Sequence, residues 1–406
     1  MFNKKKLFIS LISLAVLVSC NSSKIQSQNL TALVQKSSVQ TASVATTSPI
    51  LVTFNNAYKG LVTENEAIGR ADPKSPDKYF ISLINSAKTT IDGAFYDIGD
   101  LDVTQAFVDA KKRGVTIRLV TDSDNVLDKD NVEKPRDAVT ILRNAGIPVI
   151  EDNRSGLMHN KFMIVDGQVT WTGSMNLTTS SIFHHNNNSI MVKSPELSAN
   201  YEAEFKRLFD EKKFGPNTHE IPNKEVIVSG VSFRTYFSPK GGGQEAILEE
   251  LKKAKKSLRF MVFSMTDKAM NDVVLEKQMK ENVKVDGLFD DCMARSSYSS
   301  YKVFKTDPSI QLYRDGNQAL MHHKVIVIDD ETVVTGSFNF SANAEVTNNE
   351  NILIIKSANI AKQYDAEFAR LKYAALNNKD LPPYNHPACN GGQTQVVTPP
   401  VEAEKD

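Results

Sequence analysis

Met158 to Asn176 reads MHNKFMIVDGQVTWTGSMN, and Met321 to Asn339 reads MHHKVIVIDDETVVTGSFN. Both stretches fit one pattern, H-x-K-x4-D-x6-G-S-x-N, and their matched positions are separated by a constant offset. The matched pairs are His159 and His322, Lys161 and Lys324, Asp166 and Asp329, Gly173 and Gly336, Ser174 and Ser337, and Asn176 and Asn339. Six fixed positions repeated at one offset indicate an internal duplication.

Each copy predicts a β-hairpin that carries a cationic cluster. The runs KFMIVD and KVIVID are rich in β-branched and aliphatic residues, which favour strands. Residues two apart in a strand point to the same face, so His159 and Lys161 project together, as do His322 and Lys324. The Asp-Gly dipeptide that ends the first run predicts a tight turn, after which the next strand brings the Ser and Asn back near the His and Lys. Each copy therefore presents groups suited to a phosphate anion.

This duplicated pattern resembles the HKD motif of the phospholipase D superfamily, whose members break and re-form phosphodiester bonds. The resemblance implies an α/β fold of two pseudo-twofold-related α/β/α domains. Each domain would have a mixed central β-sheet flanked by helices, and the two would pack around one shared active site. The resemblance also implies a metal-independent reaction through a phosphohistidine intermediate, with no cofactor.

The chain around the motifs alternates strand and helix patterns in two similar halves. In the first half the patterns predict helices over 76–86, 103–113 and 134–145, with strands over 91–98 and 115–122. The second half repeats this order, and residues 150–208 align with their second copy without a gap. Such alternation favours an α/β layer structure. We predict a first domain over residues 49–222 and a second over 223–378.

Both ends of the chain predict segments outside these domains. Three lysines precede an apolar run that has the length of a signal-peptide core. The run ends in Leu-Val-Ser-Cys, which resembles a bacterial lipobox and implies removal of residues 1–19 and lipidation of Cys20; an ordinary signal peptide is the alternative. Residues 20–48 predict a flexible Ser/Thr/Gln-rich linker, and 379–406 an irregular tail. We therefore expect an exported protein of the bacterial cell envelope, anchored to a membrane by lipid.

Cysteine usage and charge exclude some classes of protein. Export would leave Cys292 and Cys389 in an oxidising compartment, where a disulfide is permitted, although the sequence does not show that they meet. Three cysteines without CxxC spacing argue against a zinc site. The 48 Lys and Arg balance 48 Asp and Glu, so no global charge steers the protein to nucleic acid; a local basic patch stays compatible with this total.

Two histidines would carry the chemistry. Imidazole can act as a nucleophile or a general acid near neutral pH, and we assign the nucleophile to His159 and the acid/base to His322, an order that a symmetric site leaves open. Glu350 and Asn187 lie 28 residues after the motif histidines, where family members place a residue that holds an imidazole. If these contacts cross between the halves, Glu350 supports His159 and Asn187 orients His322; if they do not cross, the roles reverse. The alternative is that both are ordinary strand-end residues.

The other motif residues are expected to bind phosphate or to shape the backbone. The phosphate-binding set is predicted to be Lys161, Lys324, Ser174, Asn176, Ser337 and Asn339. Turn and packing roles are predicted for Asp166 and Asp329, and close backbone approach for Gly173 and Gly336. His184 and His185 fit a solvated polar loop better than a substrate contact. Turns or helix caps, rather than metal ligands, are predicted for Asp122, Asp124, Asp290 and Asp291.

The motif predicts the reaction class more sharply than the substrate. We expect a phospholipase D-type hydrolase that releases phosphatidic acid and a free head group from glycerophospholipid, as a monomer with an internal pseudo-dimer. A non-specific extracytoplasmic endonuclease of the same superfamily and a cardiolipin synthase-like phosphatidyl transferase are the enzymatic alternatives. A surface lipoprotein that kept the fold for binding is the non-enzymatic one.

Overall fold

The computed structural model describes residues 48–56, 62–128, 135–216 and 220–377. All of them belong to one unit of the chain, Ser43–Asp406. The predicted signal peptide, Cys20, the linker up to residue 47 and the tail with Cys389 lie outside the described residues.

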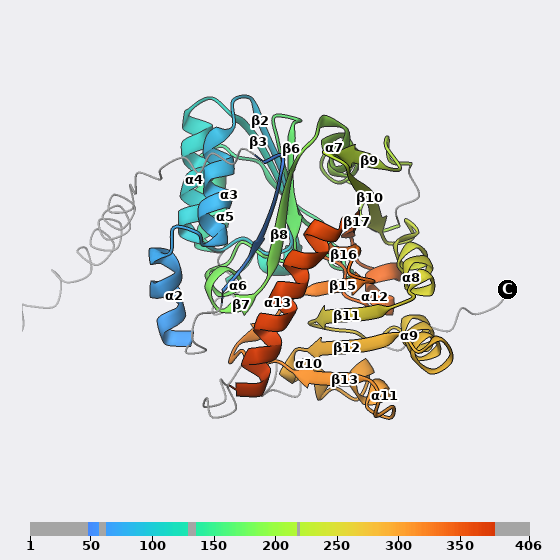
Figure 1. Cartoon of the computed structure of the whole chain (residues 1–406). Helices are drawn as coiled ribbons and strands as arrows, with labels where there is room; N and C mark the ends of the chain where they lie inside the picture. The colour runs from blue at the N-terminus through green and yellow to red at the C-terminus, as the bar shows by residue number, and fades with distance from the viewer. Residues whose placement is uncertain (1–47, 57–61, 129–134, 217–219, 378–406) are drawn as a thin grey trace, which may run out of the picture. The chain divides into compact units, whose positions relative to one another are not determined.

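Two mixed β-sheets organise the fold, one in each half of the sequence repeat (Figure 1). The first sheet has the order β1-β8-β6-β5-β2-β3-β4 and the second β13-β12-β11-β15-β16-β17-β10-β9. The strands of the first sheet are β1 (Ile50–Phe54), β2 (Thr90–Phe95), β3 (Thr116–Thr121), β4 (Val149–Glu151), β5 (Lys161–Val165), β6 (Val169–Gly173) and β8 (Asn188–Lys193). Those of the second are β9 (Val226–Val228), β10 (Val231–Ser238), β11 (Ser257–Val262), β12 (Lys284–Phe289), β13 (Gln311–Arg314), β15 (Lys324–Ile328), β16 (Thr332–Gly336) and β17 (Glu350–Lys356). The predicted fold class, two α/β halves with mixed sheets, is confirmed.

The duplicated stretch forms the predicted hairpin in each sheet. Strands β5 and β15 are buried along their whole length, which is why both read as continuous apolar runs. They pair antiparallel with β6 and β16. The turn residues Asp166 and Gly167 have φ of 53° and 62°, and Asp329 and Asp330 have 56° and 59°. Two consecutive positive φ values suit a two-residue hairpin turn, and Asp and Gly tolerate them.

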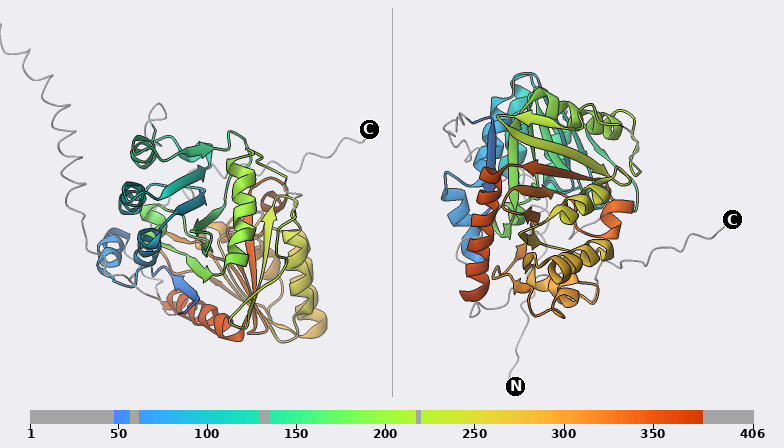
Figure 2. Two further views of the ribbon diagram at one scale, coloured as in Figure 1. Left: turned by 90° about the horizontal axis from the view of Figure 1, so that it is seen from above. Right: turned by 45° about the vertical axis from the view of Figure 1, so that its right-hand side comes forward.

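Helices cover the outer face of each sheet (Figure 1). The first sheet packs against α3 (Pro76–Ser86), α4 (Leu101–Lys112) and α5 (Asp137–Asn144), and the second against α8 (Gly243–Lys253) and α9 (Lys268–Glu281). A third core lies between the sheets and includes side chains of α7 (Pro195–Phe209) and α13 (Ala358–Asn377). Figure 2 shows α7, in light green, between the strands of the two halves.

Aromatic packing in this central core joins the two halves. The Tyr201 ring of α7 lies 5.2 Å from that of Phe162 on β5 and 5.2 Å from that of Phe237 on β10. Both contacts are edge-to-face, an arrangement that stabilises aromatic pairs by about 1 kcal/mol beyond their buried area. The halves therefore share a hydrophobic core, and the site residues at their junction are held on rigid strands.

Short elements complete the fold. They are α2 (Val62–Ala71), which the sequence patterns did not predict, η1 (Ser123–Asn125), α6 (Thr179–Phe183), α10 (Asp291–Ala294), α11 (Ser300–Phe304) and α12 (Ala342–Val346). The predicted domain boundary near residue 222 falls between α7 and β9, and it stays a prediction. Within the described ranges, none of the helices has both the length and the apolar composition needed to cross a membrane.

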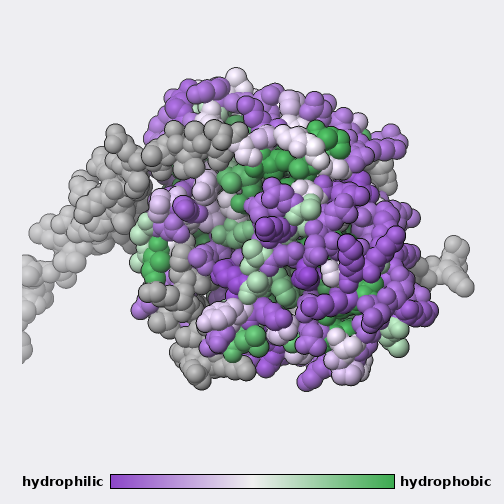
Figure 3. Space-filling view, in the orientation of Figure 1, coloured by the Kyte–Doolittle hydropathy of each residue, from purple (hydrophilic) through white to green (hydrophobic). Residues whose placement is uncertain are grey.

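Figure 3 shows that hydrophilic residues cover most of the face seen in Figure 1. A limited hydrophobic area lies in the upper part of this face. A shallow pocket of about 330 Å³ beside the edge strand β1 is lined partly by Leu51, Tyr79 and Met191. It contains none of the duplicated motif residues.

Candidate active site

The motif histidines and lysines lie where β5 and β15 begin. Lys161 Nζ donates a hydrogen bond to the His159 carbonyl oxygen at 2.7 Å, and Lys324 Nζ donates to that of His322 at 2.9 Å. His159 is 5% exposed and His322 7%, whereas both lysines are almost fully buried. Each lysine thus lies on the same side of the strand as its histidine, as the spacing predicted.

The two histidine segments pair with the opposite half of the chain. The His159 N–H donates to the Asn349 carbonyl at 2.9 Å, and the His322 N–H donates to the Asn186 carbonyl at 2.8 Å. Strand β14 (Leu320–Met321) pairs in parallel with β7 (His185–Asn186). This reciprocal exchange places both imidazoles at the same junction between the halves.

Glu350 lies directly behind the His159 imidazole. Its Oε2 is 2.7 Å from His159 Nδ1 and also accepts a hydrogen bond from Ser337 Oγ at 2.7 Å. Its Oε1 accepts from Asn348 Nδ2 at 3.3 Å. Because a carboxylate can only accept, His159 Nδ1 carries the proton and Nε2 keeps its lone pair.

Asn187 occupies the corresponding position behind His322. Its Oδ1 lies 2.9 Å from His322 Nδ1 and accepts from Ser174 Oγ at 2.8 Å, while its Nδ2 donates to the Ser181 carbonyl at 2.9 Å. These donors orient the amide so that its oxygen faces the imidazole, which again puts a proton on Nδ1. The structure therefore has the crossed arrangement, with a carboxylate behind one histidine and an amide behind the other.

Burial lowers the pKa of the four motif bases. It lowers the pKa of His159 to about 4, against an opposing effect of Glu350, and lowers the pKa of Lys161 to about 7. Burial, followed by the nearby Lys324, lowers the pKa of His322 well below its usual value. The pKa of Lys324 is also lowered, by burial and then by Lys161. These mutual effects mean that the cations of both halves lie within one electrostatic neighbourhood.

Two aromatic residues cover the motif bases, and the sequence analysis missed both. Tyr96 follows β2, and its ring lies 4.8 Å from the His159 ring and 5.2 Å from Lys161 Nζ. Phe263 follows β11, 5.0 Å from the His322 ring and 5.0 Å from Lys324 Nζ. Both positions come directly after a strand that pairs with a motif strand. Only this strand pairing, which the sequence does not show, marks the two aromatic residues as part of the site.

The predicted phosphate-binding residues divide into two groups. Asn176 and Asn339 are partly exposed and matched in position, and the Oδ1 of each is buried without a hydrogen-bond partner in the described residues. Ser174 and Ser337 are fully buried and donate to Asn187 and Glu350 instead. The prediction that these serines bind phosphate is therefore corrected: their hydroxyls hold the groups behind the imidazoles.

The motif Asp and Gly residues have local backbone contacts. The carboxylate of Asp166 accepts the N–H groups of residues 88–90, and that of Asp329 accepts those of residues 255–257. Gly173 has φ of 152°, and a Cβ there would lie 2.2 Å from the Asn188 carbonyl oxygen. Gly336 has φ of 136°, with 2.3 Å to the Asn351 carbonyl oxygen. These contacts match the predicted turn, packing and close-approach roles.

Other candidates lie in defined places. His184 caps the end of α6, but the prediction of a loop is wrong for His185, which begins β7 with its ring 6.1 Å from that of His322. Asp122 and Asp290 cap η1 and α10, as predicted. The described residues contain no group of three or more His, Cys, Asp or Glu side chains placed to hold a metal ion. Cys292 is disulfide-bonded.

The family of this chain follows from sequence comparison. A family described as "Cardiolipin synthase, PLD-like domain" matches residues 80–209 and 247–372, more than half of the chain, with one motif copy in each segment. The chain belongs to the phospholipase D superfamily. Among superfamily relatives, the chain is 30% identical over 162 residues to "Phospholipase D" of Rickettsia typhi, a match that covers 39% of this chain and 78% of that protein.

One further relative is similar in sequence, and one solved structure is similar in fold. "Mitochondrial cardiolipin hydrolase" of Chlamydomonas reinhardtii is 29% identical over 132 residues, which cover 32% of this chain and only 56% of that protein. The solved structure of phosphatidylserine synthase from Haemophilus influenzae has a TM-score of 0.57 at 12% identity and covers 80% of this chain and 86% of that one. At this identity the likeness concerns the fold.

Proposed function

We propose that this protein hydrolyses glycerophospholipid to phosphatidic acid and a free head group, with His159 as nucleophile and His322 as acid/base. The observation that carries the proposal is the crossed pair of contacts, Glu350 to His159 and Asn187 to His322. Attack on phosphorus makes the nucleophilic imidazole cationic, and a carboxylate stabilises that cation better than an amide does.

The first step forms a phosphohistidine. The Nε2 lone pair of His159 attacks phosphorus, and the bond from phosphorus to the head-group oxygen breaks as that oxygen takes a proton from His322 Nε2. Lys161 and Lys324, with the side-chain amides of Asn176 and Asn339, stabilise the charge on the phosphoryl oxygens. Glu350 accepts the His159 Nδ1–H throughout the step.

The second step regenerates the protein. Water attacks phosphorus and gives a proton to His322 Nε2, and the phosphorus–nitrogen bond breaks to return neutral His159 and release phosphatidic acid. Because burial lowers the pKa of His322, this histidine is neutral in the free protein at pH 7. The bound phosphodiester anion raises that pKa, so His322 acquires its proton when substrate binds.

Lipid is the proposed substrate class for three reasons. Relatives that match about a third of the chain are named phospholipase D and cardiolipin hydrolase. The total charge is balanced, whereas binding to nucleic acid depends on basic charge. The lipobox-like sequence before Cys20, which lies outside the described residues, supports a lipid anchor and export to the cell envelope.

The test offers the purified protein labelled phosphatidylethanolamine, phosphatidylcholine, phosphatidylglycerol and cardiolipin in mixed micelles, and labelled single- and double-stranded DNA, each with and without a chelator. We expect phosphatidic acid and free head group, or phosphatidylglycerol from cardiolipin. His159→Ala and His322→Ala should each remove at least 99.9% of turnover, a loss of about 4 kcal/mol or more in transition-state stabilisation. His184→Ala is the matched control, because it removes a histidine outside the motif and should keep most activity.

Other outcomes would redirect the proposal. DNA cleavage without lipid cleavage would make the protein a nuclease, and conversion of phosphatidylglycerol to cardiolipin would make it a transferase. Loss of all activity with chelator would contradict metal independence. Binding of lipid without turnover, unchanged in the histidine variants, would leave only the non-enzymatic alternative.

A further inference from the structure

The segment before each motif histidine needs a hydrogen-bond partner on two sides. Backbone N–H groups alternate in direction along an extended chain. The His159 N–H and the Leu157 carbonyl face Asn349 in the opposite half, at 2.9 and 2.8 Å. The Met158 N–H points the other way and donates to Asp122 Oδ2 at 2.8 Å. Asp122 thus takes the place of a neighbouring strand on that side.

The second half repeats this arrangement with a different sequence. The His322 N–H donates to the Asn186 carbonyl at 2.8 Å, and the Met321 N–H donates to Asp290 Oδ2 at 3.1 Å. The other carboxylate oxygen of Asp290 caps α10 through the Met293 N–H at 2.9 Å. In each aspartate one carboxylate oxygen, Oδ1, accepts the N–H group of the helix that it caps. The other oxygen, Oδ2, accepts the N–H group of the residue before the motif histidine.

We propose that Asp122 and Asp290 are positioning residues for the two-histidine reaction: each fixes the backbone that carries its motif histidine and places a negative charge near its motif lysine. The inference rests on the proposed phosphohistidine chemistry, but not on lipid as the substrate. Neither aspartate belongs to the H-x-K-x4-D pattern, and the two are not separated by the motif offset. They come directly after the corresponding strands of the two halves, Asp122 after β3 and Asp290 after β12.

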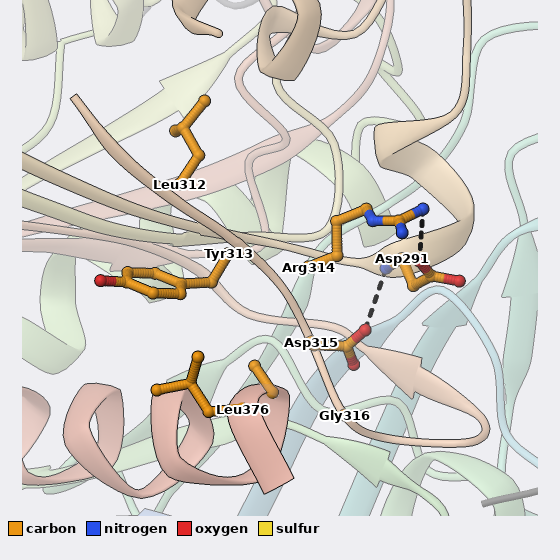
Figure 4. Close-up of a pocket in the computed structure, with 8 residues that line it drawn as sticks. Asp291, Leu312, Tyr313, Arg314, Asp315, Gly316 and Leu376 are labelled. Carbon is orange, nitrogen blue, oxygen red and sulfur yellow. Dashed lines mark hydrogen bonds and ion pairs between the residues drawn. The ribbon is translucent and has the colours of Figure 1, made fainter. Parts of the chain in front are cut away.

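A second carboxyl group, that of the buried Asp152 or of the half-buried Asp315, lies beside each aspartate. Asp152 Oδ1 accepts the Ser123 N–H at 2.9 Å, next to Asp122. Asp315 Oδ1 accepts the Asp291 N–H at 2.9 Å, next to Asp290, as the dashed line in Figure 4 shows. This contact borders a pocket of about 480 Å³ between β13 and the end of α13, which does not contain the motif histidines.

The charged groups around each aspartate explain its ionisation. Burial and then Asp152 raise the pKa of Asp122 to about 7, and burial raises that of Asp290 to about 7. Burial and then Asp290 raise the pKa of Asp315 well above its usual value. The groups that interact with Asp122 are Asp124, Asp152, Arg154, Lys161 and Tyr96, and those that interact with Asp290 are Asp291, Asp315 and Lys324.

The lysines are the groups through which the charge affects the reaction. Burial lowers the pKa of Lys161 most, and Glu350, Asp97 and then Asp122 oppose it. Burial and then Lys161 lower the pKa of Lys324, and Glu350 and then Asp290 oppose them. Above about pH 7 both aspartates are ionised, and their charge holds the pKa of each lysine higher than it would be without the carboxylate. Loss of the carboxylate charge therefore moves lysine deprotonation to lower pH.

The test separates hydrogen bonding from charge with two substitutions at each site, assayed on bis(4-nitrophenyl) phosphate. Asp122→Ala and Asp290→Ala should each lower kcat about 100-fold with KM within about two-fold, because a displacement of reacting groups by about 1 Å costs that much. Asp122→Asn and Asp290→Asn keep an acceptor for the N–H, so kcat near pH 6 should fall less than 10-fold. In both Asn variants the alkaline limb of kcat should move to lower pH.

Asp100→Asn and Asp267→Asn are the matched controls. These buried carboxylates cap α4 and α9, and their hydrogen-bond partners in the described part of the chain lie outside the two motif segments. They should lower Tm while kcat and its alkaline limb stay unchanged. Equal losses of kcat in the controls and in the Ala variants, or an unmoved alkaline limb in the Asn variants, would overturn the proposal.

An activity-independent readout separates this inference from the proposed function. The Cε chemical shift of Lys161 followed against pH should titrate at lower pH in Asp122→Asn than in Asp100→Asn. If the wild-type protein cleaves no phosphodiester, the proposed function fails, and a shifted Lys161 titration would still support the charge role. An unshifted titration would remove that role whatever the activity.

Discussion

Glu350→Gln removes one charge from behind the proposed nucleophile and keeps the shape of the side chain. The carboxylate is fully buried, and its Oε2 lies 2.7 Å from His159 Nδ1. The substituted amide can still accept the Nδ1–H through its oxygen. The variant therefore measures the value of the charge for a histidine that becomes cationic when it attacks phosphorus.

The expected loss follows from electrostatics. Two unit charges about 4 Å apart interact by about 4 kcal/mol at an effective dielectric constant of about 20. A hydrogen bond to a charged group is worth about 1 to 2 kcal/mol more than one between neutral groups. A loss of about 2 to 4 kcal/mol corresponds to a fall of about 30- to 1,000-fold in the rate of phosphohistidine formation.

The assay is the pre-steady-state burst of 4-nitrophenolate from bis(4-nitrophenyl) phosphate. This leaving group needs no proton to depart, so the burst reports the attack of the nucleophile alone. Glu350→Gln should slow the burst by that factor. Asn187→Ala should leave it within about 10-fold, because it removes only a neutral contact to His322. Thermal melting shows whether each variant is folded. A burst that is slowed more by Asn187→Ala than by Glu350→Gln would refute the assignment and exchange the roles of the two histidines.

Three further predictions concern the lysines, pH and the backbone. Lys161→Ala and Lys324→Ala should each lower kcat at least 100-fold, since each removes a buried cation beside the phosphate. A steady-state assay measures this loss, and a loss of less than about 10-fold would contradict the phosphate-binding role. With bis(4-nitrophenyl) phosphate, which needs no acid for its leaving group, the acid limb of kcat/KM should lie near pH 4, because the nucleophile His159 must be neutral and burial lowers its pKa to about 4. The alkaline limb should lie near pH 7, where Lys161 loses its proton. An acid limb at pH 6.5 would contradict this. Gly173→Ala should destabilise the protein by about 3 kcal/mol or more, seen as a lower midpoint of denaturant unfolding, because its φ is positive and a Cβ would lie 2.2 Å from the Asn188 carbonyl oxygen.

Local pattern was sufficient for the motif hairpins and the positions of His159 and Lys161. A period of two along a strand fixes which side chains share a face, and an Asp-Gly turn fixes where the strand reverses. The alternation of helices and strands likewise predicted the α/β class. The contact of Glu350 with His159 in the other half was one of two arrangements compatible with the sequence. The sequence does not show whether Glu350 contacts the histidine of its own half or that of the other half.

Residues whose roles depend on contacts between distant segments could not be predicted from the sequence. Tyr96 and Phe263 are unremarkable aromatic positions until β2 and β11 pair with the motif strands. Ser174 was placed in the phosphate site because its strand returns toward His159, but its hydroxyl turns toward Asn187. His185 was placed in a loop because the polar run around it has no strand period, and its pairing with Leu320 depends on the other half of the chain.

The identity of the phosphorylated residue tests the central claim most directly. His322→Ala should accumulate the adduct with bis(4-nitrophenyl) phosphate, because departure of 4-nitrophenol needs no acid whereas attack by water needs the base. After quenching in alkali, which preserves phosphohistidine, mass spectrometry of peptides should find the adduct on His159, and none in His159→Ala. An adduct on His322 in His159→Ala, or wild-type turnover with no histidine adduct at any time, would contradict the account.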